Sequence, residues 1–534
     1  MHEPVSTAEL IPPLGAFPSA NGTTFRVWAP AALTVAVAAG GHEHALAPAP
    51  AGVFEATLPI VAETDYELVI DRRARLPDPW SRCQPQGLRG PSRVTDVAGL
   101  RAGRHDAAWD GLTLDGLVIY ELHVGTFSPE GTFAGAIPRL RGLRELGVTA
   151  IELMPVATFA GNHGWGYDGV YTFAPHPAYG GPAGLAELIG AAHETGLGVI
   201  LDVVYNHIGA GSDQVTAFGP YTTSRAQTFW GEAIDYSRPA VREWACQNAE
   251  MWIRDYGIDG LRLDAVHAIV DDSPEHVLAE LARRVRAIDP GALLIDEIGI
   301  GDLRPIEQWG HDAQWEDALH HAAHVLLTGE QESYYARYGR VQDLADELAR
   351  PQGRRFVVCA QNHDQVGNRA FGDRLRGRAL RLAAFCAILS RGTPMLFQGE
   401  EYDESHPFQY FTDHIDPRIA ELTREGRRKE FAEFSGFEAE EIPDPQDPET
   451  FVRSKLDPAD GDPRHLAYYR ELLALRRELP DELVVAEVDE HRRLIRWRRG
   501  EVELTANFSD REQDGVPART GVAVRGGKPA LAGP

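Results

Sequence analysis

The spacing of apolar and polar residues changes character near position 105. Before it, short alternating segments such as 23–30 (TTFRVWAP) and 63–70 (ETDYELVI) are separated by stretches rich in Ala, Pro and Gly. Alternation broken by turn residues is typical of antiparallel strands. Residues 1–105 are therefore expected to form an antiparallel β domain.

From Leu117 onward, short apolar runs alternate with segments of helical spacing. In 185–196, for example, Leu185, Leu188, Ile189 and Ala192 share one helical face. With one uncertain strand near 311–315, the pattern predicts eight strands: 117–125, 148–156, 198–207, 260–266, 292–299, 311–315, 355–363 and 393–402. Alternating strands and helices indicate an α/β fold, although periodicity alone does not separate a closed barrel from an open sheet. The catalytic barrel is assigned to 106–480, and a small antiparallel β domain to 481–534.

Three carboxylates stand where predicted strands end. Asp264 follows GLRL, Glu297 follows ALLID, and Asp364 follows RRFVVCAQNH. In an eight-stranded α/β barrel the carboxyl ends of the strands open on one face, where the chemistry is found. Converging carboxylates at that face are what cleavage of a glycosidic bond requires. Taken singly, each acid would more often be a solvated loop residue or part of an ordinary ion pair.

Composition excludes some partners. The formal net charge of −27 over 534 residues disfavours nucleic acid, which is bound through Lys and Arg. The longest apolar stretch, 380–390, is too short to span a membrane. Residues 1–17 contain no basic segment followed by a hydrophobic one, so we expect no signal peptide and a cytoplasmic enzyme. The four cysteines (83, 246, 359 and 386) have no metal-type spacing.

Four strings at predicted strand ends identify a family. DVVYNH (202–207), GLRLDAVH (260–267), IDE (295–297) and QNHDQ (361–365) are similar, in this order, to the four sequence regions of the α-amylase family of glycoside hydrolases. The resemblance covers the barrel and implies a (β/α)8 TIM barrel. It also implies that the N-terminal domain is the β-sandwich that precedes the barrel in some members.

The resemblance implies a role for each acid. Asp264 would be the nucleophile, Glu297 the proton donor and then the base, and Asp364 the residue that stabilises the transition state. Retention by this route needs Glu297 to enter the reaction protonated and Asp264 ionised, with Arg262 beside Asp264 favouring its charged form. His207 and His363 would donate hydrogen bonds to the same sugar and Tyr167 would stack beneath it. Asp202 would brace the strand ends.

Two residues of IDE (295–297), Asp296 and Glu297, compete for the role of proton donor, because Asp296 stands where the family usually has a small residue. If Leu294 faces inward, strand alternation favours Asp296, unless a bulge re-aims the chain. The family pattern and the longer side chain favour Glu297.

Metal sites are considered and not expected. His320 and His324 of HHAAH (320–324) have a spacing seen in zinc sites, but no third ligand is identifiable, so they are interpreted as packing residues. Asn206 matches a calcium-binding position of some amylases, but the acidic insert loops that complete such a site are not evident. No cofactor is predicted.

Further strings narrow the family. YELHVGTFSPEGTF (120–133), DAQWEDALHHAAHVLLTGE (312–330), GEEYDESHPFQYFTDH (399–414) and LPDPWSRCQPQGLRGPS (76–92) resemble the maltooligosyltrehalose trehalohydrolases. Those enzymes cut the α-1,4 bond between a maltooligosaccharide and a terminal trehalose and release trehalose with net retention. This implies maltooligosyltrehalose or α-glucan and water as substrates, and a maltooligosyltrehalose synthase as functional partner. It implies a substrate site lined by Tyr167, His207, Arg262, Leu263, Ala265, Val266, His267, Asp312, Ala313, Gln314, Trp315, Glu316, His363, Gln365, Val366, Gly367 and Asn368.

Two alternatives stay open. A glucan branching or debranching enzyme shares the ELH-x-GTF start and the sandwich, but the FQYFTDH string argues against it. A non-catalytic α-glucan-binding protein would be expected to lack one of Asp264, Glu297 and Asp364. Gly301, where the trehalohydrolase pattern favours Asn, and shortened loops leave the trehalose selectivity open.

Overall fold

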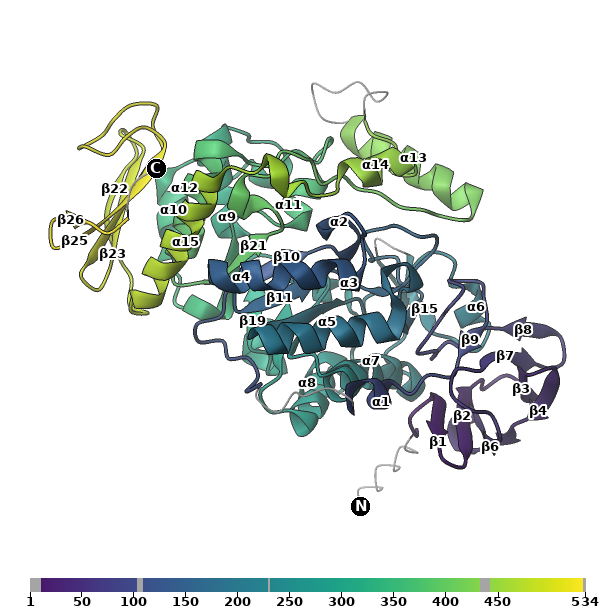
Figure 1. Cartoon of the computed structure of the whole chain (residues 1–534). Helices are drawn as coiled ribbons and strands as arrows, with labels where there is room; N and C mark the ends of the chain where they lie inside the picture. Colours follow the sequence, from purple (N-terminus) through teal and green to yellow (C-terminus); the bar gives the residue numbers. More distant parts are fainter. Residues whose placement is uncertain (1–10, 103–108, 229–230, 433–441, 532–534) are drawn as a thin grey trace, which may run out of the picture.

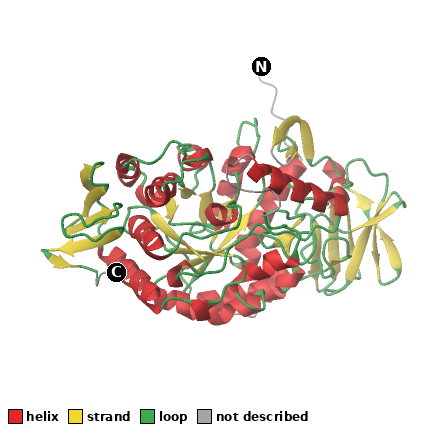
Figure 2. Ribbon diagram, turned by 90° about the horizontal axis from the view of Figure 1, so that it is seen from above, coloured by secondary structure: helices red, strands yellow, loops and turns green. Residues whose placement is uncertain are grey.

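A closed barrel of parallel strands forms the centre of the molecule, with antiparallel sheets at the two ends of the chain (Figure 1). The computed structural model describes residues 11–102, 109–228, 231–432 and 442–531. The N-terminal and C-terminal sheets lie on opposite sides of the barrel, as the view from above also shows (Figure 2). Residues 1–10, part of the segment on which the expectation of no signal peptide rests, lie outside the described residues.

The barrel strands follow one another in chain order, and β21 pairs with β10 to close the ring. They are β10 (Ile119–Leu122), β11 (Ala150–Leu153), β14 (Gly198–Val203), β17 (Gly260–Leu263), β18 (Leu293–Asp296), β19 (Ala313–Trp315), β20 (Phe356–Cys359) and β21 (Thr393–Phe397). The uncertain strand near 311–315 is β19. The predicted TIM barrel is confirmed, and closure excludes the open sheet.

Helices cover the outside of the barrel because their apolar faces pack on the outward residues of the strands. Leu185, Leu188, Ile189 and Ala192 of α5 are buried as predicted. The helices are α1 (Val97–Ala102), α2 (Val124–Phe127), α3 (Phe133–Ala136), α4 (Leu140–Leu146), α5 (Gly181–Thr195), α6 (Asp213–Thr216), α7 (Pro239–Met251), α8 (Val277–Ile288), α9 (Ala318–Thr328), α10 (Val341–Leu348), α11 (His363–Gly367), α12 (Gly377–Ile388), α13 (Pro417–Ala432), α14 (Pro448–Arg453) and α15 (Pro463–Glu478). Within the described ranges, no helix is both long enough and apolar enough to cross a membrane.

The N-terminal part consists of two antiparallel sheets packed face to face. Phe25 and Phe54 of one sheet and Val37 and Leu68 of the other share one apolar core. The first sheet contains β1 (Gly15–Ser19), β2 (Gly22–Trp28), β6 (Val53–Leu58) and β5 (Ala47–Pro48), and the second contains β4 (His42–Ala45), β3 (Val35–Ala39), β7 (Asp65–Ile70), β8 (Ala74–Leu76) and β9 (Ser92–Arg93). This arrangement is the expected sandwich.

The C-terminal sheet packs on α12 through aromatic rings. Trp497 is fully buried, and its ring centroid lies 5.5 Å from that of Phe385. Gly521 leaves room for Phe385, because a Cβ there would lie 2.4 Å from the ring. The strands are β22 (Val484–Asp489), β23 (Leu494–Arg499), β24 (Val502–Asn507), β25 (Thr520–Arg525) and β26 (Lys528–Pro529). We propose 1–105, 106–480 and 481–534 as the limits of the three parts.

Two short hairpins complete the described strands. They are β12 (Ala157–Thr158) with β13 (Tyr171–Pro175), and β15 (Thr222–Thr228) with β16 (Gly231–Ile234). The first lies in the connection from β11 to α5 and the second in the connection from β14 to α7, so both belong to loops at the carboxyl end of the barrel.

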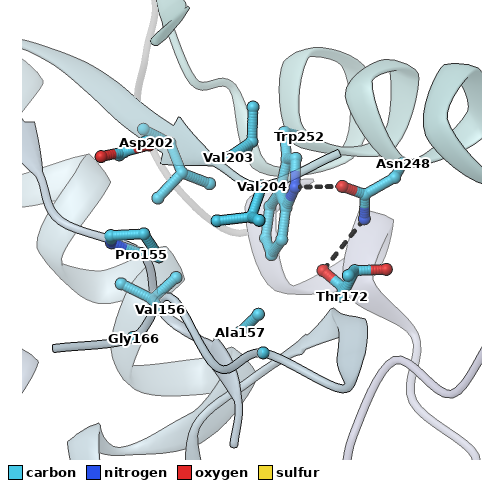
Figure 3. Close-up of a pocket in the computed structure, with 12 residues that line it drawn as sticks. Pro155, Val156, Ala157, Gly166, Thr172, Asp202, Val203, Val204, Asn248 and Trp252 are labelled. Atoms are coloured by element: carbon cyan, nitrogen blue, oxygen red, sulfur yellow. Dashed lines mark hydrogen bonds between the residues drawn. The ribbon is translucent and has the colours of Figure 1, made fainter. Parts of the chain in front are cut away.

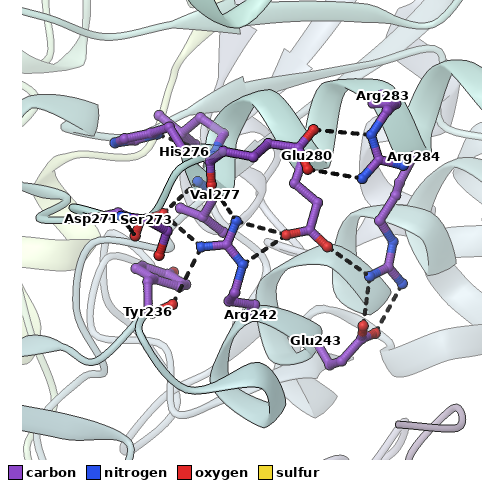
Figure 4. Close-up of polar contacts among 12 residues, drawn as sticks. Tyr236, Arg242, Glu243, Asp271, Ser273, His276, Val277, Glu280, Arg283 and Arg284 are labelled. Carbon is purple, nitrogen blue, oxygen red and sulfur yellow. Dashed lines mark hydrogen bonds and ion pairs between the residues drawn. The ribbon is translucent and has the colours of Figure 1, made fainter. Parts of the chain in front are cut away.

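Ion pairs join α7 and α8 to the loop that follows β17 (Figure 4). Arg242 of α7 lies 2.7 Å from both Asp271 of the loop and Glu280 of α8. Arg284 of α8 lies 2.8 Å from Glu243 of α7. Asp271 also accepts a hydrogen bond from Val277 N–H, which begins α8. Because the loop starts at the end of β17, this network restrains the backbone that follows Asp264.

We predict that Arg242→Met lowers the free energy of unfolding by about 2–4 kcal/mol, because the Asp271 side chain is 1% exposed and would lose its cation. Arg283→Met is the matched control on α8, since Arg283 pairs with the exposed Glu275 of the loop before that helix. Arg283→Met is expected to lower the free energy of unfolding by about 0.2–1 kcal/mol. Chemical unfolding followed by circular dichroism would measure both, and equal losses would contradict the prediction.

Candidate active site

Side chains on the barrel strands point alternately into the barrel and toward the helices. On β18, Leu293 and Ile295 belong to the apolar cluster inside the barrel, whereas Leu294 belongs to the cluster shared with the helices. Glu297 therefore continues the inward face and Asp296 the outward face. The premise that Leu294 faces inward was wrong, and regular alternation is enough to aim Glu297 at the barrel axis.

Asp296 has a different environment from Glu297. It is fully buried, its carboxylate binds Nδ1 of His311, and Nε2 of His311 lies 3.1 Å from the carbonyl oxygen of Leu278 in α8. Burial raises the pKa of the Asp296 carboxyl, although the His311 ring opposes this. Asp296 thus connects β18 to the surrounding helices.

Arg262 lies at the centre of the candidate site and is fully buried. Its Nη1 donates to Asp202 at 2.6 Å and to Asp264 at 2.9 Å, and its Nη2 donates to Glu297 at 2.8 Å. The guanidinium also lies over the Trp315 ring, 4.1 Å from its centroid. A buried cation needs such partners because losing water is costly. One guanidinium therefore fixes three carboxylates from three neighbouring strands.

Neighbouring groups fix Asp264 and Glu297 further. Nδ2 of Asn206 donates to Asp264 Oδ2 at 2.7 Å. The Ala265 N–H donates to Glu297 Oε2 at 2.9 Å, and Ala265 adopts the left-handed φ of 40°. A non-glycine residue in this region is strained, and such strain concentrates at functional sites. Oε2 of Glu297 has two donors, so Oε1 is the oxygen available for a proton.

Asp364 enters the site at the start of α11, after β20. Its neighbour His363 is buried, with Nδ1 2.6 Å from Glu121 Oε1 and Nε2 2.8 Å from the Tyr167 hydroxyl. Burial lowers the pKa of His363, but the charges of Asp364 and Glu121 outweigh it and raise the pKa to about 10. His363 is therefore a cation at neutral pH, beside the carboxylate of Asp364.

Tyr167 links the two sides of the site. Its hydroxyl donates to Asp202 at 2.7 Å, and its ring stacks on that of His363 with centroids 5.2 Å apart. Asp202 thereby binds both Tyr167 and Arg262, in agreement with the bracing role predicted for it. Burial, opposed by Arg262, raises the pKa of Asp202 to about 7.

His207 contacts protein oxygens through both ring nitrogens. Nε2 lies 2.9 Å from the Tyr167 carbonyl oxygen, and Nδ1 binds Asn206 Oδ1. The predicted hydrogen bond to a sugar would require exchange of one of these contacts.

Access to the three acids increases from Asp264 through Glu297 to Asp364. The exposed fractions of the side chains are 9% for Asp264, 24% for Glu297 and 34% for Asp364. A ligand at the carboxyl end of the barrel can therefore touch all three. A cavity of about 20 Å³, lined by Asp202, Asn248 and Trp252 among others, has room for a water molecule but not for a sugar (Figure 3).

Most residues predicted to line the substrate site follow a barrel strand and lie at the same end as Asp264. These are Tyr167, His207, Ala265, Val266, His267, Glu316, His363, Gln365, Val366, Gly367 and Asn368. Trp315 lies below Arg262. Leu263 packs toward the helices and Ala313 inside the barrel. Gln314 donates to the carbonyl oxygen of Asp302 at 2.8 Å.

Asp312 does not lie with them. It precedes β19, its N–H donates to the Leu294 carbonyl, and its carboxylate accepts from Leu294 N–H and from Arg286. Since parallel strands begin at one end of the barrel and finish at the other, Asp312 lies at the opposite end from Asp264. This position speaks against the prediction that Asp312 contacts sugar, because β19 runs between Asp312 and Glu316.

Sequence reasoning missed two groups at the site. Asp317 follows β19 at the start of α9, and burial with the charges of Asp364 and Glu297 raises its pKa to about 7. Glu121 of β10 faces inward. Its carboxylate binds both the backbone N–H and the ring Nδ1 of His363. Asp317 could have been found from the same sequence feature as Asp264, because it is an acidic residue just after a predicted strand. The signal for Glu121 was a charged residue inside an apolar strand.

The HHAAH histidines contact aromatic residues. The ring of His320 lies 2.8 Å from the Ala360 carbonyl oxygen through Nδ1 and 3.1 Å from the Tyr335 hydroxyl through Nε2, and His324 stacks on Tyr335. Throughout the described ranges, no group of three or more His, Cys, Asp or Glu residues is arranged to hold a metal ion.

Comparisons with known proteins agree with this geometry. The family model for the alpha amylase catalytic domain matches residues 95–230 and 227–487. The chain is 42% identical to the malto-oligosyltrehalose trehalohydrolase of Deinococcus radiodurans over 87% of this chain and 82% of the relative, and 41% identical to that of Rhizobium sp. strain M-11 over 91% of each. The crystal structure of a Salmonella typhimurium protein assigned to the alpha amylases has a TM-score of 0.89 and 35% identity, covering 96% of this chain and 99% of that chain.

The raised pKa of His363 leads to a pH prediction. A histidine whose folded-state pKa lies near 10 contributes stability that is fully present below its unfolded value of about 6.5 and is lost as pH rises through about 10. The stability difference between wild type and His363→Gln should therefore shrink from pH 6 to pH 10. Thermal midpoints measured across this range would test it, with His267→Gln, an exposed histidine, as control. A difference that stays constant would contradict the charged state of His363.

Proposed function

The chain belongs to the alpha-amylase family and, within it, to the malto-oligosyltrehalose trehalohydrolases, and from this membership we propose how its site works. It is a glycoside hydrolase that cleaves the α-1,4 bond next to the terminal trehalose of maltooligosyltrehalose and releases trehalose. The observation that carries the assignment of roles is the single Arg262 guanidinium that binds both Asp264 and Glu297.

In the proposed first step, an Asp264 oxygen attacks the anomeric carbon and forms a glycosyl-enzyme ester. Glu297 gives its proton, from Oε1, to the oxygen of the departing trehalose. The bond between the anomeric carbon and that oxygen breaks, and trehalose leaves. A single guanidinium between the two acids suits the separation of about 5–5.5 Å that retaining enzymes need.

In the second step, Glu297 takes a proton from water, which attacks the same carbon and displaces Asp264. The maltooligosaccharide leaves with its anomeric configuration retained. Asp364 would stabilise the positive charge that develops on the sugar ring in both steps. The protonated His363 supports this role, since it is already paired with Glu121 and so leaves an oxygen of Asp364 for the sugar.

Two alternative functions are less well supported than trehalose release: a branching or debranching enzyme, and a non-catalytic glucan-binding protein. A branching or debranching enzyme would use the same acids, but the relatives that match most of this chain are named trehalohydrolases. A non-catalytic glucan-binding protein would not need a nucleophile and an acid, nor a cation such as Arg262 that holds them together. The intact group of Asp264, Glu297 and Asp364 favours catalysis.

The biological setting is likewise a proposal. Maltooligosyltrehalose has to be made by an enzyme that forms the trehalose linkage at the end of an α-glucan, so a maltooligosyltrehalose synthase is the functional partner. A cytoplasmic location is proposed from the sequence, and the four cysteines are free.

We predict that incubation with maltotetraosyl trehalose releases trehalose and maltotetraose, measured by anion-exchange chromatography. Pullulan and branched glucan serve as controls for the alternatives, and neither should be cleaved at an appreciable rate. Cleavage of α-1,6 bonds or transfer of glucan chains without release of trehalose would favour a branching or debranching enzyme.

The assignment of the acid is tested by a matched pair of variants. Glu297→Gln should lower kcat by a factor of about 10²–10⁴, the usual contribution of general acid–base catalysis. Asp296→Asn should leave most activity in the folded protein, because Asp296 binds His311 on the outward face. Loss of activity in Asp296→Asn alone, with a normal thermal midpoint, would show that the acid was misassigned.

A further inference from the structure

Four arginines gather at the amino end of the barrel, where the C-terminal sheet meets it. Because all barrel strands are parallel, this end lies opposite to the end that carries Asp264. Such a concentration of positive charge is unusual in a chain whose formal net charge is −27. The four are Arg354 in the short helix η8 (Gly353–Arg355) before β20, Arg391 in the turn before β21, Arg476 in the last turn of α15 and Arg499 at the end of β23.

Arg476 and Arg499 bind the backbone of the turn that contains Arg391. The carbonyl oxygen of Ser390 accepts from Arg476 Nη1 at 2.9 Å and from Arg499 Nη1 at 2.6 Å. Nε of Arg499 donates to the carbonyl oxygen of Pro480 at 2.9 Å. Neither guanidinium forms an ion pair with a carboxylate of the described ranges. Two cations therefore share one neutral acceptor, and their charges are not neutralised by direct contact.

The positive charges affect one another. Burial, together with the charges of Arg499 and Arg354, lowers the pKa of Arg476 to about 9. Burial lowers the pKa of Arg499 to about 10, and the charges of Arg391 and Arg354 add to this while Asp481 opposes it. An added anion would relieve this repulsion, since an opposite charge nearby favours the charged form of each arginine.

Arg354 and Arg391 lie on two sides of a single carboxylate, at long distances. Nη2 of Arg354 lies 3.4 Å from Asp481 Oδ1, and Nη2 of Arg391 lies 3.8 Å from Asp481 Oδ2. Nη1 of Arg391 is 3.5 Å from the carbonyl oxygen of Arg350, and its buried Nε has no partner among the described residues. Charge-assisted N–H···O bonds are normally about 2.7–2.9 Å long. The donors of Arg391 are therefore not saturated.

The backbone of η8 makes room for Arg391, and solvent reaches the site. Gly353 adopts a φ of 56°, and a Cβ there would lie 3.1 Å from Arg391 Nη2. The exposed fractions of the side chains are 34% for Arg354, 24% for Arg391 and 45% for Asp481. Arg354 also pairs with Asp115, whose side chain is 81% exposed. A small solute can thus approach both guanidiniums from solution.

We propose that Arg354 and Arg391 form a binding site for a phosphoryl dianion, either free phosphate or a phosphate monoester, with Arg476 and Arg499 adding positive charge beside it. The planar guanidinium matches phosphate oxygens through paired N–H donors. A dianion brings two negative charges to a place where Asp481 supplies one. The site is separate from the candidate active site and does not depend on the proposed function.

Binding is measured by isothermal titration of the full-length protein with sodium phosphate at about pH 7.5, where a phosphoryl group is mostly a dianion. Sodium chloride keeps the ionic strength constant, so that screening does not change. The wild type should show saturable binding at one site. Arg354→Gln and Arg391→Gln should each raise Kd about 10-fold, the usual effect of losing a charge-assisted hydrogen bond. Arg498→Gln is the control, since Arg498 pairs with Glu503 on the C-terminal sheet, and should leave Kd unchanged.

A change at Asp481 tests the sign of the effect. Asp481→Asn removes the carboxylate that competes for both guanidiniums, so phosphate should bind about 3- to 10-fold more tightly. Unchanged or weaker binding in Asp481→Asn with a normal thermal midpoint would overturn the proposal, as would the absence of saturable binding to the wild type. This variant decides the question even if the arginine variants do not fold.

The source of the phosphoryl group is distinguished by a second titration with glucose 6-phosphate. A lower Kd than that of phosphate would support a phosphate monoester as the ligand, and an equal or higher Kd would support free phosphate. Uncharged glucose is the control for the sugar ring. Binding of glucose that Arg391→Gln weakens as much as it weakens binding of phosphate would contradict recognition of the phosphoryl group.

Discussion

Arg262 is the residue on which the arrangement of the candidate site depends. Its guanidinium is fully buried among barrel strands, and a buried cation must be paired with anions that are themselves held in place. The anions are Asp202, Asp264 and Glu297, one from each of three adjacent strands. The same ion pairs that satisfy the charge of Arg262 thus fix the distance and orientation of the two acids assigned to the reaction. Removing Arg262 would disturb all three carboxylates together.

A second charged group completes the site from the other side of the barrel. Glu121 and Asp364 keep His363 protonated, and Tyr167 joins this pair to Asp202 and so to Arg262. The interior of the barrel therefore contains two cations that alternate with carboxylates. Glu152 lies among them, buried, with both oxygens unpaired by any residue of the described ranges, and burial raises its pKa well above the usual value. The raised pKa favours the neutral form of Glu152, which avoids adding another negative charge.

The sequence predicted the architecture well because its signals are local. Apolar runs and helical spacing are properties of short segments, so the barrel, the sandwich and even the short strand β19 could be anticipated. Family strings located Asp264, Glu297 and Asp364. The differences concern direction: which face Leu294 occupies and which end of β19 carries Asp312 are set by pairing with strands distant in sequence. Asp317 and Glu121 gain their significance only from neighbours contributed by other strands and loops.

The central claim is that Asp264 and Glu297, held by one guanidinium, cleave maltooligosyltrehalose with retention. Proton NMR of the first turnover products tests this most directly, because the anomeric signal of the released maltooligosaccharide reports which face of the sugar water attacked. The account predicts that the α anomer appears first and equilibrates only later with the β anomer. Initial appearance of the β anomer would show inversion and would contradict the assignment of Asp264 as nucleophile.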